Sequence, residues 1–213
     1  MIGGRDGIFV KICGITSEED ALVAVAMGAD SVGFVFAPSA RQISPVAVSQ
    51  IVRRLPSEVM TIGVFKNETP EKVVEIVGAC GLAGAQLHGN ESTDSTKWIA
   101  ERIGVTIKAF TAGSDEASRA RDYGAYAVML DSITPGGGEL FDWSLAEGID
   151  PGMKMILAGG LTPSNVGEAI ASVNPWGVDV SSGVESIPGR KDARKIREFI
   201  EQARSQHTTA RYS

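Results

Sequence analysis

The chain has 213 residues, of which 43% are hydrophobic and 22% charged, and its formal net charge is −6. This composition is that of an ordinary globular protein with a substantial core, and the length suits a single α/β domain. The excess of acidic residues, with no cluster of lysine or arginine, argues against nucleic acid as a partner.

Short β-rich runs alternate with longer helical patterns eight times along the chain. The expected strands cover residues 8–13, 32–36, 59–65, 83–87, 105–109, 126–130, 154–158 and 177–180. The expected helices cover residues 17–27, 45–54, 70–79, 93–102, 115–122, 143–147, 163–171 and 191–204. Alternation at this spacing predicts parallel strands with right-handed crossovers, and eight units favour closure of the sheet. We therefore expect a (β/α)8 TIM barrel, a single domain over residues 1–213 with peripheral tails at 1–7 and 206–213.

The cysteines and the apolar runs indicate in which cellular compartment the protein resides. Only Cys13 and Cys80 occur, in no metal-binding or redox spacing, which fits a reducing environment and no bound metal. No apolar stretch reaches the length of a transmembrane helix, and the N-terminal residues are too polar for a signal peptide. We expect a cytoplasmic protein without a membrane partner.

Two reactive side chains end apolar runs. Cys13 closes the first expected strand and Asp131 follows the sixth, which are positions where a (β/α)8 barrel carries its active site. We interpret them as a base and an acid. Lys11 shares the inward parity of Cys13, so its charge is expected to stabilise a thiolate and lower the pKa of Cys13. The alternatives are a buried structural cysteine and a helix-capping aspartate.

Three further polar residues lie near the same expected edge. Asp179 has inward parity on the eighth strand and needs a partner there, for which Lys11 is the candidate. Arg41 lies after the second strand, where its guanidinium suits a carboxylate, although a surface arginine is an equal alternative. His88 ends the fourth strand in line with Gln86, and a histidine satisfied by hydrogen bonds is the simpler interpretation of it.

Two glycine-containing turns follow the seventh and eighth strands. In (β/α)8 barrels these loops are the recurrent phosphate site, because glycines let backbone N–H groups approach the oxygens and serine hydroxyls add donors. Both turns occur at the ordinal strands that such a site requires. The predicted phosphate-binding residues are Gly159, Gly160, Ser181, Ser182 and Gly183.

Taken together, these segments resemble the phosphoribosylanthranilate isomerases of tryptophan biosynthesis. The matching pieces span nearly the whole chain in the family's order, and the first and last are highly specific in combination. They are Val10–Thr16, Gly33–Phe36, Ser39–Arg41, Gly63–Phe65, Gln86–Gly89, Leu130–Ser132, Phe141–Trp143, Leu157–Leu161, Val178–Glu185 and Pro188–Gly189.

The resemblance implies a role for each matching residue. Cys13 corresponds to the general base, Asp131 to the general acid and Arg41 to the residue that holds the anthranilate carboxylate. The two turns correspond to the phosphate site, and His88 and Asp179 to positions near the substrate. The chain departs from the family at Gly136–Glu139, where a Gly-Gly-Thr-Gly sequence is usual. The altered segment lies close to Asp131 in the sequence. It is therefore expected to affect the rate of turnover more than which reaction is catalysed.

The resemblance also implies the reaction, an Amadori rearrangement of N-(5-phosphoribosyl)anthranilate to the aminoketose phosphate. The partner is then a small phosphorylated amino-sugar, and no cofactor is needed because the substrate nitrogen serves as the electron sink. The chain is expected to be a monomer or a homodimer. The alternatives are another sugar-phosphate isomerase or epimerase barrel, and a non-catalytic barrel that binds a phosphate ligand.

Overall fold

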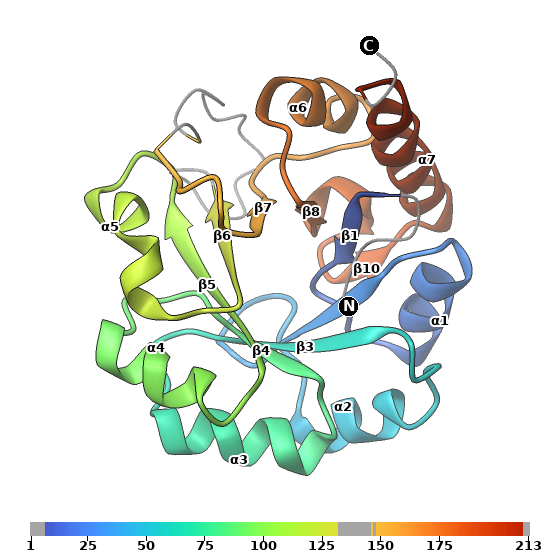
Figure 1. The fold of residues 1–213 in the computed structure, drawn as a ribbon. Coiled ribbons are helices and arrows are strands. Elements are labelled where there is room, and N and C mark those ends of the chain that lie inside the picture. Colours follow the sequence, from blue (N-terminus) through green and yellow to red (C-terminus); the bar gives the residue numbers. More distant parts are fainter. Residues whose placement is uncertain (1–6, 132–145, 147, 211–213) are drawn as a thin grey trace.

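Eight parallel strands close into a barrel in the computed structural model, which describes residues 7–131, 146 and 148–210 (Figure 1). Neighbouring strands follow one another in chain order, and β8 pairs with β1, so that Lys11 lies opposite Asp179 in register. The strands are β1 (Phe9–Ile12), β2 (Ser31–Val35), β3 (Met60–Phe65), β4 (Gly84–Leu87), β5 (Val105–Thr111), β6 (Ala127–Asp131), β7 (Met155–Leu157) and β8 (Gly177–Val180). The TIM-barrel prediction is confirmed.

Helices surround the barrel, and α1 to α6 connect successive strands apart from β6 and β7, whose connection lies largely outside the described residues (Figure 1). They are α1 (Glu18–Ala26), α2 (Pro45–Val52), α3 (Pro70–Cys80), α4 (Thr93–Ala100), α5 (Asp115–Ser118), α6 (Val166–Val173) and α7 (Ala193–Ala210). Short 3-10 helices occupy Ala120–Tyr123 (η2) and Ser182–Val184 (η4), and β9 (Glu185–Ile187) pairs with β10 (Arg190–Lys191) beyond β8.

Helix starts follow local hydrogen-bonding chemistry. The side chains of Ser17, Ser44 and Thr69 accept from backbone N–H groups and cap α1, α2 and α3. The expected helix at 163–171 instead begins at Val166, because the Asn165 carboxamide folds back onto the loop: its oxygen accepts from the Thr162 N–H at 2.8 Å.

Three further helices differ from expectation or lie largely outside the described residues. The helix expected over 115–122 is divided into α5 and η2, since Arg119 leaves helical geometry (φ −106°, ψ 19°). The last helix runs from Ala193 to Ala210, beyond the expected end at residue 204 and into the tail expected over 206–213. Of the two expected tails, residues 1–6 and 211–213 are not described. The expected helix at 143–147 lies, apart from residue 146, outside the described residues.

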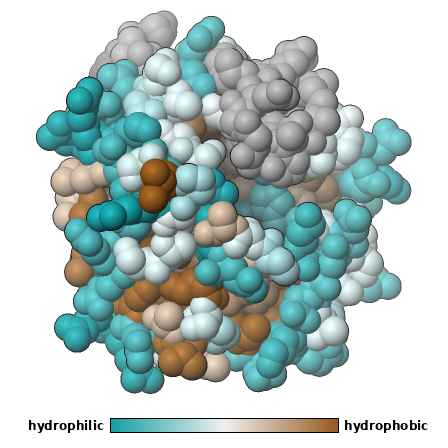
Figure 2. Space-filling model, turned by 180° about the vertical axis from the view of Figure 1, so that it is seen from behind, coloured by the Kyte–Doolittle hydropathy of each residue, from teal (hydrophilic) through white to brown (hydrophobic). Residues whose placement is uncertain are grey.

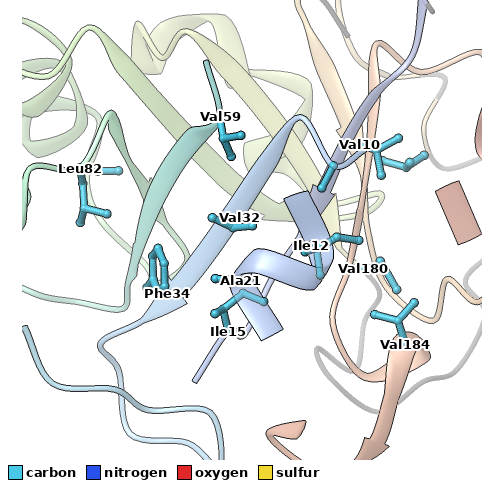
Figure 3. Close-up of a cluster of buried hydrophobic side chains, with 14 of the residues drawn as sticks. Val10, Ile12, Ile15, Ala21, Val32, Phe34, Val59, Leu82, Val180 and Val184 are labelled. Carbon is cyan, nitrogen blue, oxygen red and sulfur yellow. The ribbon is translucent and has the colours of Figure 1, made fainter. Parts of the chain in front are cut away.

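Strand alternation divides the core into two layers. Outward-facing residues of the strands, such as Val10, Ile12 and Val32, pack with the surrounding helices, and Figure 3 shows part of this cluster with Ala21 from α1. Inward-facing residues, such as Phe9 and Met129, fill the barrel itself. Burial of a large apolar side chain contributes about 1.5–3 kcal/mol, so both layers stabilise the strand register strongly.

The outer surface carries mostly hydrophilic side chains on the face shown in Figure 2, where hydrophobic residues gather toward the bottom of the view. Large hydrophobic residues that are exposed include Leu22, Met27, Val46 and Ile187. None of the helices in the described ranges is long and apolar enough to cross a membrane.

Candidate active site

The carboxyl ends of the strands surround a cavity of about 280 Å³. Nine of the ten predicted site residues line it: Cys13, Arg41, His88, Asp131, Gly159, Gly160, Asp179, Ser181 and Ser182. Gly183 does not line this cavity. A Cβ atom on Gly183 would lie 1.9 Å from the carbonyl oxygen of Leu161, so this glycine lets the turn after β8 pack against the turn after β7.

Cys13 lies beside a buried ion pair. Lys11, which is 0% exposed, places its Nζ 2.9 Å from Oδ1 of Asp179. Gly33 on β2 makes room for this group, because a Cβ atom there would lie 2.9 Å from Cys13 Sγ and 3.0 Å from Lys11 Nζ. The expected pairing of Asp179 with Lys11 is confirmed.

The expected lowering of the pKa of Cys13 is wrong. Burial raises the pKa of the thiol, and the charges of Lys11 and Lys191, which lower it, do not compensate. Burial also lowers the pKa of Lys11, but Asp179 and Cys13 outweigh this effect, so the net pKa of Lys11 is raised and the lysine stays charged.

Arg41 binds a carboxylate of its own chain. Its Nε and Nη2 donate to the two carboxylate oxygens of Glu185 at 2.7 and 2.8 Å, a bidentate pair. The arginine side chain crosses Gly14, where a Cβ atom would lie 2.6 Å from Arg41 Cδ and where φ is +74°. Only glycine fits this turn, both for its backbone geometry and for its lack of a side chain.

Lys191 completes this charged cluster. Its Nζ donates to Glu185 at 2.9 Å and to the carbonyl oxygen of Ser181, in the turn after β8, at 3.1 Å. Burial lowers the pKa of Lys191, and Glu185 opposes that shift. Burial raises the pKa of Glu185, but Arg41 and Lys191 hold it below its ordinary value. Sequence reasoning missed both roles: Glu185 lies in a segment matched to the family, whereas no sequence signal pointed to Lys191.

His88 and Asp131 form a hydrogen-bonded pair. His88 Nε2 lies 3.0 Å from Asp131 Oδ2, and His88 Nδ1 lies 2.8 Å from the amide nitrogen of Gln86. The interpretation of His88 as a residue satisfied by hydrogen bonds is therefore confirmed, and its partner on one side is the candidate acid.

The two predicted phosphate turns lie next to each other at the cavity. Gly159 and Gly160 both have positive φ, of 84° and 65°, which glycine adopts without strain. Asn165 fixes the first turn by donating to the Gly160 carbonyl at 3.0 Å. Lys191 fixes the second turn at Ser181. Both turns are thus held in place by side chains outside the predicted site.

A second cavity of about 400 Å³ adjoins the first and shares Lys66, His88 and Asp131 with it. Its wall includes the buried pair of Lys108 and Glu91, with Nζ and Oε2 3.0 Å apart. The altered segment Gly136–Glu139 lies outside the described residues. Within the described ranges no group of His, Cys, Asp and Glu side chains is arranged to hold a metal ion.

A closed parallel barrel with a thiol, a carboxylate and two glycine turns at its strand ends defines a (β/α)8-barrel protein, and its strand ends carry groups of the kinds that acid–base catalysis and anion binding use. The family model for N-(5'phosphoribosyl)anthranilate (PRA) isomerase matches residues 10–202. The chain belongs to this family. It is an isomerase of tryptophan biosynthesis, of the intramolecular aldose–ketose class, and the family match decides against the two alternative barrels.

Individual relatives agree with this assignment. The N-(5'-phosphoribosyl)anthranilate isomerase of Desulforudis audaxviator is 48% identical over 92% of this chain and 97% of its own length. The crystal structure of phosphoribosyl anthranilate isomerase from Thermus thermophilus superposes with a TM-score of 0.87 at 40% identity, covering 93% of this chain and 99% of the other.

Two further solved structures, each 44% identical with a TM-score of 0.82, cover 93% of this chain and 99% of their own. One is a phosphoribosyl anthranilate isomerase in complex with reduced 1-(o-carboxyphenylamino)-1-deoxyribulose 5-phosphate. The other comprises monomers generated from the dimeric enzyme of Thermotoga maritima.

Proposed function

We propose that this chain converts N-(5'-phosphoribosyl)anthranilate to 1-(2-carboxyphenylamino)-1-deoxyribulose 5-phosphate, with Asp131 as the general acid and Cys13 as the general base. The observation that carries the assignment is that both groups line one cavity, Asp131 at the end of β6 and Cys13 directly after β1, beside the two glycine turns. The complex of a 44% identical relative with a reduced form of this product supports the choice of substrate.

The first step opens the furanose ring. Asp131 in its protonated form gives its proton to the ring oxygen, the bond from that oxygen to C1 breaks, and the nitrogen lone pair forms a C1=N iminium. The ring oxygen becomes a hydroxyl that stays attached to the opened sugar chain, and Asp131 is left as a carboxylate that balances the charge of the iminium. His88 holds Asp131 Oδ2 at 3.0 Å and thereby fixes the direction of the acid.

The second step removes the proton from C2. The iminium acidifies this C–H bond, and the Cys13 thiolate takes the proton while the bond electrons form an enolamine. Reprotonation at C1 with loss of the C2 hydroxyl proton then gives the ketone. Burial disfavours the Cys13 thiolate, so Lys11, Lys191 and the iminium are the cations that stabilise it during turnover.

The ends of the substrate are held separately. We assign the phosphate to the turns at Gly159–Gly160 and Ser181–Ser182, and the anthranilate carboxylate to Arg41. Glu185 occupies Nε and Nη2 of the guanidinium, so it fixes the plane of Arg41 and leaves Nη1 outside that pair. Gly183 supports the phosphate turn by its close packing on Leu161.

The setting of the protein follows from this chemistry. No cofactor is needed, because the substrate nitrogen accepts the electrons. We propose a cytoplasmic enzyme with a small phosphorylated amino-sugar as its substrate and with no nucleic acid or membrane partner. Its assembly as a monomer or a homodimer remains a prediction, which sedimentation of the purified chain would decide.

The test compares Cys13→Ser with Cys80→Ser in a fluorescence assay that follows consumption of the anthranilate substrate. Cys80 is the matched control, since it is also buried but lies on α3, where its Sγ contacts the carbonyl of Pro45 at 3.3 Å. We expect Cys13→Ser to lose roughly 10²-fold or more in kcat, because a serine hydroxyl is a much weaker base, and Cys80→Ser to retain activity. Retention by Cys13→Ser of more than about a tenth of the activity would exclude it as the base.

A further inference from the structure

Gln86 carries a buried acceptor that nothing in the described part of the chain satisfies. The residue lies on β4 with 1% exposure and lines the cavity with His88 and Asp131. Its amide nitrogen lies 2.8 Å from His88 Nδ1 and 3.3 Å from the Met129 sulfur, but its Oε1 has no hydrogen-bond partner among the described residues. A buried acceptor without a partner is costly, so another arrangement of this amide must compete with the present one.

The present orientation of the amide fixes the tautomer of His88. An amide nitrogen can only donate, so Nδ1 of His88 must accept and the ring proton resides on Nε2. Nε2–H then donates to Asp131 Oδ2 at 3.0 Å, which requires that oxygen to be an acceptor. In this arrangement the hydrogen shared by His88 and Asp131 belongs to the imidazole, so Asp131 Oδ2 carries no proton of its own to give to a substrate.

A second proton in this contact changes what Nδ1 needs. Whether the pair is written as imidazolium and carboxylate or as imidazole and carboxylic acid, Nδ1 then carries a hydrogen and needs an acceptor. Rotation of the Gln86 amide by half a turn exchanges its oxygen and nitrogen, so Oε1 faces Nδ1. A hydrogen bond from a charged imidazolium is stronger than the contact of the amide with sulfur that is given up.

We propose that Gln86 is a positioning residue that presents Oε1 to the Nδ1–H of His88 when the His88–Asp131 pair is protonated, so that the pair stores the proton donated to the ring oxygen. The proposal rests on the proposed function, in which Asp131 is the acid. The task falls to Gln86 because its amide lies within hydrogen-bond distance of His88 Nδ1, whereas Asp131 contacts the ring at Nε2.

Other charges face the same pair. Lys66 from the end of β3 lines both cavities, Cys13, Arg41 and Asp179 line the first, and Lys108, Glu91 and Glu116 line the second. All of these remain unchanged when Gln86 alone is substituted. A change in the protonation of His88 in such variants therefore reports on the group at position 86 that faces Nδ1.

The first test follows the His88 ring nitrogens by ¹⁵N NMR in the full chain, with His207, the only other histidine, as an internal reference. We expect the Nε2–H tautomer in the neutral form. In Gln86→Glu, where a carboxylate faces Nδ1, the midpoint of His88 protonation should rise by about 1–3 pH units, and in Gln86→Met it should fall. The control is Gln42→Glu, because Gln42 bonds to the carbonyl of Phe36 outside the cavity.

The second test measures the pH dependence of kcat in the same variants. The alkaline limb, where the protonated pair is lost, should move to higher pH in Gln86→Glu and to lower pH in Gln86→Met, and it should stay in place in Gln42→Glu. A neutral His88 with its proton on Nδ1 would overturn the proposal. So would an alkaline limb that stays fixed while the His88 midpoint moves. The NMR readout needs no turnover, so an unaltered chain that fails to consume the substrate would count against the proposed function alone.

Discussion

Replacement of Lys11 by methionine tests how the charge inside the barrel is balanced. Lys11 is fully buried and pairs with the buried Asp179 at 2.9 Å. Removal of the lysine leaves a carboxylate in the barrel without its cation, and loss of one partner of a buried pair costs about 3–5 kcal/mol. In a chain of this size each kcal/mol lowers Tm by about 2–4 °C, so we expect Tm to fall by roughly 6–20 °C.

The double variant Lys11→Met with Asp179→Leu separates the cost of an unpaired charge from the value of the pair. Replacement of both partners by apolar residues is often neutral or stabilising, so the double variant should recover most of the lost stability. Thermal unfolding followed by circular dichroism measures all three proteins. The control is Lys72→Met, which breaks an exposed pair with Glu75 (48% and 66% exposed) and should change stability by less than about 1 kcal/mol. If Lys11→Met unfolds like this control, or if the double variant is no more stable than the single one, the unpaired Asp179 carboxylate does not destabilise the barrel.

Three further predictions concern ligand binding, acid stability and substrate range. Arg41→Met should weaken binding of carboxylate-bearing ligands by about 1.5–3 kcal/mol and leave inorganic phosphate affinity nearly unchanged; equal losses in titration calorimetry would place Arg41 elsewhere. Burial raises the pKa of Glu91, but Lys108 and backbone donors outweigh it and hold the pKa below the ordinary 4.5. The stability from Glu91 is therefore complete above pH 4.5 and is lost as the pH falls, and Glu91→Gln should show a shallower acid loss in urea titrations at several pH values. Because the first strand leads into Cys13 rather than an aspartate, we expect no isomerisation of the doubly phosphorylated amino-sugar of histidine biosynthesis. Growth of a histidine auxotroph that lacks this isomerisation, when it carries the gene for this chain, would contradict the expectation.

The sequence alone determined the barrel and the direction of its side chains. Strand alternation has a period of two residues, so Lys11 and Asp179 had to share the inward face once the strands were located. Ser17, Ser44 and Thr69 cap helices by accepting hydrogen bonds from backbone N–H groups three residues later, so these helix starts can also be predicted from the sequence. Local geometry also limited the prediction of helix starts. The side chain of Asn165 accepts from the Thr162 N–H in a turn, and α6 begins at Val166, three residues later than expected.

The tertiary structure decided the partners and the electrostatic balance of the site. Arg41 donates to the carboxylate of Glu185, which lies 144 residues away in the sequence. Lys191, from the β9–β10 hairpin, donates to the same carboxylate. Sequence parity placed Lys11 near Cys13, but the sign of the net pKa shift depended on how deeply the thiol is buried and on every charge around it. Periodicity and capping act between near neighbours in the chain, whereas burial and ion pairing sum contributions from segments that only the closed barrel brings together.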